Sequence, residues 1–207
     1  MTYVLVPGAG GEAWYWLLVA PLLAEATIAV ELPTGDPDAG LQDYADAITA
    51  AAGDRERVTL VAQSMGAFSA PLAKLDVAKI ILVAPMIPAP GETPGQWWTT
   101  SGLPDAGAPP FDPVTSFFHD VPQAVTDEAF RRGEPKQADR PFADPWPLEA
   151  WPDIPTWVIG GLQDRLFPYP FMQRIARERL GVEVEPIDSG HMPALSRPEE
   201  LARTMLV

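Results

Sequence analysis

The hydroxyl of Ser64 is the side chain of this sequence best placed to act as a nucleophile. It lies in the segment Val-Thr-Leu-Val-Ala-Gln-Ser-Met-Gly at residues 58–66, where an apolar, β-branched run gives way at once to a helix-compatible segment. A serine at such a strand-to-helix corner points its hydroxyl out of the sheet, and small residues two positions away on either side allow the tight bend. The usual pattern is G-x-S-x-G, and Ala62 replaces its first glycine. The segment therefore predicts a nucleophile elbow with one departure from the common pattern.

Two later segments can supply the base and the acid that a serine nucleophile requires. A serine hydroxyl is a poor nucleophile until a base takes its proton, and that base is usually a histidine held by a carboxylate. Asp164 follows the expected strand at residues 156–159, and His191 follows the last expected strand. Asp188 is a competing acid, but its position three residues before His191 suits it better to shaping that turn. We therefore predict a triad of Ser64, His191 and Asp164.

Acyl transfer also needs hydrogen-bond donors aimed at the oxyanion that develops on the reacting carbonyl. In an elbow of this kind one donor is the backbone N–H of the residue after the nucleophile, which is Met65. The second comes from the loop after the first strand, Pro7-Gly8-Ala9-Gly10-Gly11, and we assign it to the N–H of Ala9. Each such donor lowers the barrier by about 3 kcal/mol.

Short β-branched runs alternate with helix-like segments along most of the chain. The expected strands are residues 3–6, 27–30, 58–62, 80–84, 156–159 and 182–187. The expected helices are residues 14–26, 41–52, 65–75, 169–180 and 198–206. Most of the strand runs lack polar alternation, which is typical of strands covered on both faces. The pattern predicts an α/β fold with a parallel sheet between helices, whose active site lies at the carboxyl ends of the strands.

Residues from Met86 to about Pro155 break this alternation. The stretch is rich in Pro, Gly, Trp and Phe, has only a weak helical pattern near residues 123–132, and is far longer than a connection between two strands needs. Its aromatic residues favour an insertion that folds over the edge of the sheet rather than a disordered linker. We therefore expect a core of residues 1–86 and 155–207 and a lid of residues 87–154. The residues expected to border the substrate are Gln63, Met86, Trp97, Trp98, Phe117 and Phe118.

The chain resembles the α/β-hydrolase superfamily, and within it the compact group that contains plant methylesterases and hydroxynitrile lyases. The resemblance rests on the opening segment at residues 4–16, the elbow, the acid loop Gly161–Pro168 and the histidine loop Asp188–Pro193, so it extends over essentially the whole chain. It implies an α/β-hydrolase fold of about six mostly parallel strands that lacks the superfamily's first two strands. It also implies a helical lid inserted after the fourth strand, and no cofactor. Pro7 stands where that group usually has a histidine that braces the oxyanion loop.

Composition narrows the classes of function. The chain has no cysteine, which excludes disulfides and thiolate chemistry, and its two histidines, His119 and His191, are too few for a typical histidine-rich metal centre. The formal charge of −14 argues against binding nucleic acid or an anionic membrane. The longest apolar tract, residues 14–30, is interrupted by Pro21 and Glu25, and the opening residues lack the basic segment of a signal peptide. We therefore expect a cytoplasmic protein whose partner is a small-molecule ester, with the oligomeric state left open.

The favoured prediction is a hydrolase of small hydrophobic carboxylic esters, and three alternatives remain open. Residues 8–13 also fit the dinucleotide pattern G-x-G-x-x-A, although no tyrosine is followed four positions later by the lysine that a short-chain reductase, an NAD(P)-dependent oxidoreductase, would carry. Hydroxynitrile lyases of the similar group use a threonine at the position of Gly8 and a lysine from the lid. In this chain the expected lid has a single lysine, Lys136. The third alternative is a small-molecule receptor with an intact triad.

Overall fold

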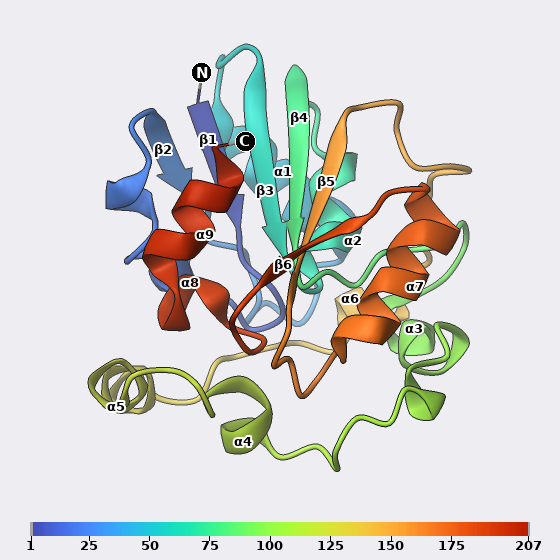
Figure 1. Cartoon of the computed structure of the whole chain (residues 1–207). Helices are drawn as coiled ribbons and strands as arrows, with labels where there is room; N and C mark the ends of the chain where they lie inside the picture. Colours follow the sequence, from blue (N-terminus) through green and yellow to red (C-terminus); the bar gives the residue numbers. More distant parts are fainter. Residues whose placement is uncertain (1, 207) are drawn as a thin grey trace.

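A six-stranded parallel sheet forms the centre of the computed structural model, which describes residues 2–206 (Figure 1). The strands are β1 (Thr2–Val6), β2 (Ala26–Ala29), β3 (Val58–Gln63), β4 (Val77–Val83), β5 (Thr156–Gly161) and β6 (Val184–Ile187). Their order across the sheet is β2-β1-β3-β4-β5-β6, and every neighbouring pair is parallel. The predicted α/β fold, with about six parallel strands flanked by helices, is confirmed.

The strand order reverses between β1 and β3. The chain passes from β1 to β2 at one edge of the sheet and then adds β3 to β6 on the other side of β1. In open α/β sheets the carboxyl ends of the strands at such a reversal leave a crevice in which ligands bind. The loops after β1 and β3, which hold the expected oxyanion donors and Ser64, therefore lie side by side at this position.

Helices cover both faces of the sheet, and each face has its own apolar core. One face is covered by α1 (Leu41–Ala52), α2 (Gly66–Ser69) and α7 (Tyr169–Leu180), and the other by η1 (Ala13–Trp16), α8 (Pro193–Ser196) and α9 (Pro198–Met205). Along β3, Leu60 and Ala62 belong to the first core and Val61 to the second, because alternate side chains of a strand point to opposite faces. Burial on both faces explains the continuous apolar run in the sequence.

Two predicted helices, α1 and α7, have the predicted bounds, and α9 ends one residue earlier than predicted. The helix expected over residues 14–26 is wrong. That stretch forms two short 3-10 helices, η1 and η2 (Ala20–Leu22), and β2 begins at Ala26. Pro21 lies at the start of η2, and a proline has no N–H to continue a helix through it. Pro71 similarly divides the helix expected over residues 65–75 into α2 and η3 (Ala70–Leu72).

Residues 84–155 join β4 to β5 and are called here the inserted segment. Its helices are α3 (Pro94–Thr100), η4 (Leu103–Asp105), α4 (Pro113–Phe117), α5 (Gln123–Arg132) and α6 (Arg140–Ala143). Figure 1 shows the segment passing from α3, beside α7, through α4 beyond the carboxyl ends of the strands to α5. The segment then returns to the side of the sheet where it began. It therefore covers the edge of the sheet at which the candidate residues lie.

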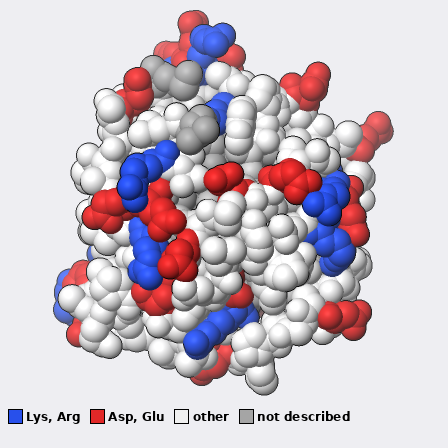
Figure 2. Space-filling model, in the orientation of Figure 1, with Lys and Arg blue, Asp and Glu red and all other residues white. Residues whose placement is uncertain are grey.

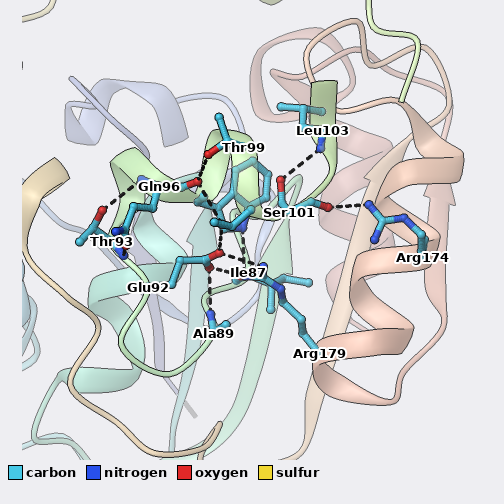
Figure 3. A network of polar contacts seen from close by, with 12 residues as sticks. Ile87, Ala89, Glu92, Thr93, Gln96, Thr99, Ser101, Leu103, Arg174 and Arg179 are labelled. Carbon is cyan, nitrogen blue, oxygen red and sulfur yellow. Dashed lines mark hydrogen bonds and ion pairs between the residues drawn. The ribbon is translucent and has the colours of Figure 1, made fainter. Parts of the chain in front are cut away.

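A buried ion pair fixes the start of the inserted segment to α7 (Figure 3). Arg179 Nη2 lies 2.9 Å from Glu92 Oε1, and Glu92 Oε2 accepts the N–H of Ala89 at 3.0 Å. Arg179 Nη1 also donates to the carbonyl of Ile87 at 2.6 Å. Both charged side chains are largely shielded from solvent. Because a buried charge is costly without its partner, these contacts hold the chain before α3 in one position.

Acidic and basic side chains are intermixed on the face of the molecule that Figure 2 shows. The ion pairs between exposed side chains include Arg174 with Glu178 and Arg177 with Glu183. Among residues 2–206, no helix combines the length and the apolar character that crossing a bilayer would take.

Candidate active site

Ser64 lies at the turn between β3 and α2 and has a positive φ of 50°. Such a conformation is strained for a residue other than glycine and is typical of functional sites. Two backbone hydrogen bonds of 3.0 Å hold the turn, from Ser64 N–H to the Val83 carbonyl and from Met86 N–H to the Ser64 carbonyl. A Cβ on Gly66 would lie 2.6 Å from the carbonyl oxygen of Pro7, so the turn requires glycine there. The backbone around Ser64 thus has the form of a nucleophile elbow.

Ala62, which replaces the usual first glycine of the elbow, is an ordinary strand residue. It is fully buried in β3, between Val6 of β1 and Leu82 of β4. It does not have the positive φ that would favour glycine. The sheet therefore accommodates the alanine methyl group without altering the turn that follows.

The structure brings Ser64, His191 and Asp164 into one hydrogen-bonded line. His191 Nε2 lies 3.3 Å from Ser64 Oγ, and His191 Nδ1 lies 2.9 Å from Asp164 Oδ2. The second oxygen of Asp164 accepts the backbone N–H groups of Leu166 at 2.8 Å and Phe167 at 2.9 Å. His191 is 1% exposed, Asp164 6% and Ser64 8%, so the line is almost entirely shielded from solvent. Such an arrangement can move a proton from the serine hydroxyl to the imidazole and stabilise the resulting imidazolium.

Asp188, the competing acid, lies outside this line. Its side chain is exposed and accepts a hydrogen bond from Gln163 Nε2 at 2.5 Å. Its backbone N–H lies 3.4 Å from Glu200 Oε1. These contacts join the acid loop and α9 to the start of the histidine loop, which is the turn-shaping position predicted for this residue.

The acid loop and the histidine loop pack backbone against backbone. Gln163 N–H donates to the Ser189 carbonyl at 3.0 Å, and Leu162 N–H donates to the Ile187 carbonyl at 2.9 Å. A Cβ on Gly161 would lie 2.6 Å from the carbonyl oxygen of Gly190, so this close approach requires glycine. The two loops therefore carry Asp164 and His191 as one unit at the ends of β5 and β6.

The loop after β1 lies directly against the elbow. Gly11 N–H donates to the Gly8 carbonyl at 3.0 Å and closes the turn. A Cβ on Gly8 would lie 2.9 Å from Ser64 Cβ, so the loop can approach this closely only with glycine. Within residues 2–206, the backbone N–H groups of Ala9 and Met65 donate no hydrogen bond, whereas Gly10 N–H donates to Gln137 Oε1 at 2.7 Å. The two predicted donors thus have no partner among these residues, and their role as an oxyanion hole stays a prediction.

Of the aromatic residues expected to border the substrate, Phe117 is nearest to the triad. Its ring centroid lies 5.5 Å from that of His191. The ring centroids of Trp97 and Trp98 lie 5.0 and 5.7 Å from that of Phe167. Because Phe167 itself packs on His191, one ring separates each tryptophan from the histidine. Trp97 is fully buried, and its indole N–H donates to the carbonyl of Ile87.

The other three residues of that group have different surroundings. Phe118 packs on Phe130 of α5 and on the second core rather than on the triad. Gln63 is buried, and its Nε2 donates to the His191 carbonyl at 3.4 Å. Met86 is buried and contacts the elbow through its backbone N–H. Gln63 and Met86 thus support the backbone of the site, and a contact with substrate stays a prediction for each.

Three residues that sequence reasoning did not select contact the site. Phe167 packs edge-on against His191, with the ring centroids 4.8 Å apart. The side chain of Asp120 accepts the N–H of Gly190 at 2.7 Å. The side chain of Gln137 accepts the N–H of Gly10. Phe167 could have been found from its place in the acid loop. Asp120 and Gln137 belong to the inserted segment and contact residues 70 and 127 positions away, for which no local pattern gives a signal.

The two described surface cavities lie elsewhere. One, of about 370 Å³, is lined by Gly102, Asp105, Ala106, Pro170, Phe171 and Arg174. The other, of about 310 Å³, is lined by Pro33, Asp36, Asp38, Ala39 and Asp43. Neither of these two cavities contains a triad residue. Residues 2–206 also hold no group of three or more His, Asp or Glu side chains arranged to bind a metal ion.

Comparison with known proteins assigns the chain to a family. The profile of the alpha/beta hydrolase family matches residues 3–204. The chain belongs to this family. Its glycine-rich opening is accordingly followed by the four-residue 3-10 helix η1 and not by the longer helix that a dinucleotide fingerprint begins. A search of curated sequences found no match.

Solved structures of the same fold include several esterases. Polyneuridine aldehyde esterase has a TM-score of 0.80 and 20% identity, with 99% of this chain and 97% of that chain covered. A methylesterase from Arabidopsis has a TM-score of 0.76 and 20% identity, with 100% of this chain and 97% of that chain covered. A pyrethroid hydrolase from Sphingobium faniae JZ-2 has a TM-score of 0.74 and 22% identity, with 100% of this chain and 96% of that chain covered. The predicted resemblance to the plant methylesterase group is confirmed.

Proposed function

We propose that this alpha/beta hydrolase cleaves small hydrophobic carboxylic esters by an acyl-enzyme mechanism. The observation that carries the proposal is the line from Asp164 through His191 to Ser64 at the carboxyl ends of three strands. The esterases among the structural neighbours support the same reaction class.

In the first half of the reaction Ser64 Oγ attacks the ester carbonyl carbon while His191 Nε2 takes the hydroxyl proton. The N–H groups of Ala9 and Met65 stabilise the oxyanion of the tetrahedral intermediate. The bond from the carbonyl carbon to the alkoxy oxygen then breaks, and His191 gives its proton to the leaving alcohol. Asp164 keeps the imidazole in the required tautomer and stabilises it when it is charged.

In the second half a water molecule repeats the sequence on the acyl-enzyme. His191 takes a proton from the water as its oxygen attacks the acyl carbon, and returns the proton to Ser64 Oγ as the carboxylic acid leaves. The inserted segment acts as the lid of the site, because its Phe117 packs on the imidazole and its Trp97 and Trp98 pack on Phe167, the acid-loop residue that contacts the imidazole. Apolar rings at this position favour esters with hydrophobic groups, and shielding from water strengthens the electrostatic interactions inside.

A panel of p-nitrophenyl esters of graded chain length, with a fluorophosphonate label, tests the proposal. Wild-type protein is expected to hydrolyse the shorter esters and to be labelled at Ser64. Ser64→Ala should lose labelling, with kcat reduced by several orders of magnitude and the fold intact. Substantial activity in Ser64→Ala would refute the role of Ser64. Failure to label folded wild type would favour a receptor, and cyanide release from mandelonitrile without ester turnover would favour a lyase.

A further inference from the structure

We propose that Asp120 is a positioning residue of the site: by accepting the N–H of Gly190 it fixes the histidine loop so that His191 faces Ser64. Asp120 Oδ2 lies 2.7 Å from the Gly190 nitrogen, across 70 positions of sequence. Gly190 immediately precedes His191, so a hydrogen bond at its nitrogen restrains the backbone that carries the imidazole. A carboxylate acceptor makes this bond stronger than one between neutral groups.

The inserted segment presses closely on Gly190. A Cβ on this residue would lie 2.6 Å from both Asp120 Oδ1 and His119 Cε1, so a side chain there would have to displace both. On its other side Gly190 meets the backbone of Gly161, at the start of the acid loop. Gly190 is thus held between the acid loop and the inserted segment. On the side of the inserted segment, the hydrogen bond to Asp120 sets the orientation of the Gly190 backbone.

Asp120 has no other hydrogen-bond partner among the described residues. Its Oδ1 is buried without a partner there, as are both ring nitrogens of His119. Buried polar groups are normally satisfied, so a carboxylate kept at this cost calls for an explanation. The bond to Gly190 supplies one, because it is the single polar contact that Asp120 makes within residues 2–206.

The carboxylate of Asp120 also influences the buried hydroxyl of Tyr15. Burial raises the pKa of the Tyr15 hydroxyl, and the nearby charges of Asp164 and Asp120 raise the pKa further. Tyr15 Oη in turn lies 3.5 Å from the backbone nitrogen of Ala194, three residues beyond His191. Asp120 and Asp164 therefore approach the histidine loop from two different parts of the chain.

A readout independent of activity is the NMR signal of the His191 Nδ1 proton, which the hydrogen bond to Asp164 protects from exchange. The chain has two histidines, so His191→Gln identifies the signal by its disappearance. The signal is expected in wild type and in Asp120→Asn, which keeps an acceptor for Gly190 N–H, and is expected to be lost by exchange in Asp120→Ala. A wild-type signal in Asp120→Ala would overturn the proposal.

The kinetic readout rests on the proposed function and is expressed per active site titrated with fluorophosphonate, so that unfolded molecules do not count. Asp120→Ala is expected to lower kcat by about 10- to 100-fold with KM nearly unchanged, as for a misplaced catalytic group. Asp120→Asn should stay within a few-fold of wild type. The matched control is Asp127→Ala, since Asp127 is an exposed acid of the same segment whose bond, from Gln123, stays within α5.

The outcomes separate the two proposals. Unchanged kcat per site in Asp120→Ala, or equal losses in the Ala and Asn variants, would overturn the role of Asp120. If Asp120→Ala yields no folded protein, Asp120→Glu decides, because it keeps the charge but displaces the acceptor, and an unchanged kcat per site would again overturn the proposal. Wild type that neither labels nor hydrolyses esters would refute the proposed function, and the NMR signal would still decide the role of Asp120.

Discussion

Phe167 meets His191 edge-on, with the ring planes at 90° and the centroids 4.8 Å apart. The backbone N–H of the same residue donates to Asp164 Oδ1 at 2.9 Å. One residue of the acid loop therefore fixes the carboxylate through its backbone and covers the imidazole through its ring. Because the ring also packs on Trp97 and Trp98, it joins the triad to the inserted segment.

Replacing Phe167 with alanine is expected to destabilise the protein and to weaken catalysis. The ring is 1% exposed, and truncation of a buried phenylalanine costs about 3–5 kcal/mol of unfolding free energy. The backbone hydrogen bond to Asp164 can persist, so folded molecules should still label with fluorophosphonate, though more slowly. Thermal denaturation and the labelling rate measure the two effects. Wild-type stability in Phe167→Ala would contradict the packing described here.

The two acids of the site are expected to respond very differently to removal of their charge. Asp164→Asn should lower kcat by roughly 10³- to 10⁴-fold, because an amide can hold the imidazole in the wrong tautomer and cannot stabilise the imidazolium. Asp188→Asn should leave kcat within about twofold, since Asp188 is exposed and its side chain bonds only to Gln163 among the residues that the structure describes. Steady-state hydrolysis of a p-nitrophenyl ester compares them. Equal losses in the two variants would refute the assignment of the acid.

Phe117 and Phe118 are adjacent in sequence and provide a matched pair for the pocket. Phe117 lies 5.5 Å from the His191 ring, whereas Phe118 packs on Phe130. Phe117→Ala is expected to raise KM for hydrophobic esters by about tenfold, corresponding to the roughly 1–3 kcal/mol of a lost apolar contact. Phe118→Ala should change thermal stability more than KM. A larger rise of KM in Phe118→Ala would place the substrate on the other side of α4.

Gln137 is expected to influence the barrier through the loop after β1. Its Oε1 accepts Gly10 N–H, next to the proposed oxyanion donor Ala9. Gln137→Met keeps the bulk and removes the acceptor, and kcat should fall by less than the 10²- to 10³-fold that follows loss of a whole donor. Tyr44→Phe is the control, because it removes only one of the two acceptors of Gln137 Nε2 and leaves the other, the carbonyl of Ala138. A fall in kcat limited to Tyr44→Phe would argue against this role.

The buried pair of Glu92 and Arg179 is expected to contribute to stability rather than to chemistry. Glu92→Gln leaves Arg179 largely buried without its counter-charge, and breaking such a pair costs about 3–5 kcal/mol. Glu178→Gln removes the partner of Arg174 in an exposed pair and should cost no more than about 1 kcal/mol. Urea denaturation followed by circular dichroism measures both. Similar midpoints for the two variants would show that the Glu92 pair is not effectively buried.

The sequence by itself determined the sheet, the elbow and the order of the triad residues. The inner strands β1, β3, β4 and β5 are largely buried and have continuous apolar runs, so they could be recognised without the structure, whereas the edge strands β2 and β6 are partly exposed and were recognised from their β-branched residues. Ser64, Asp164 and His191 each follow a strand, and parallel strands end at the same edge, so their convergence was also predictable. The prediction of a helix over residues 14–26 was wrong because it relied on the apolar content of the segment and gave too little weight to Pro21. Proline has no N–H, so a helix cannot continue through this position.

Only the tertiary structure decided how the inserted segment meets the site. The contacts of Asp120 with Gly190 and of Gln137 with Gly10 depend on the path of a proline-rich chain with short helices. Such a path has no periodic pattern that could place Asp120 and Gln137, since the partners of both lie far away in the sequence. The periodicity of apolar residues in the sequence indicates which face of a helix or strand is buried. A long-range hydrogen bond between a side chain and a backbone N–H does not affect that periodicity, so it cannot be predicted from it.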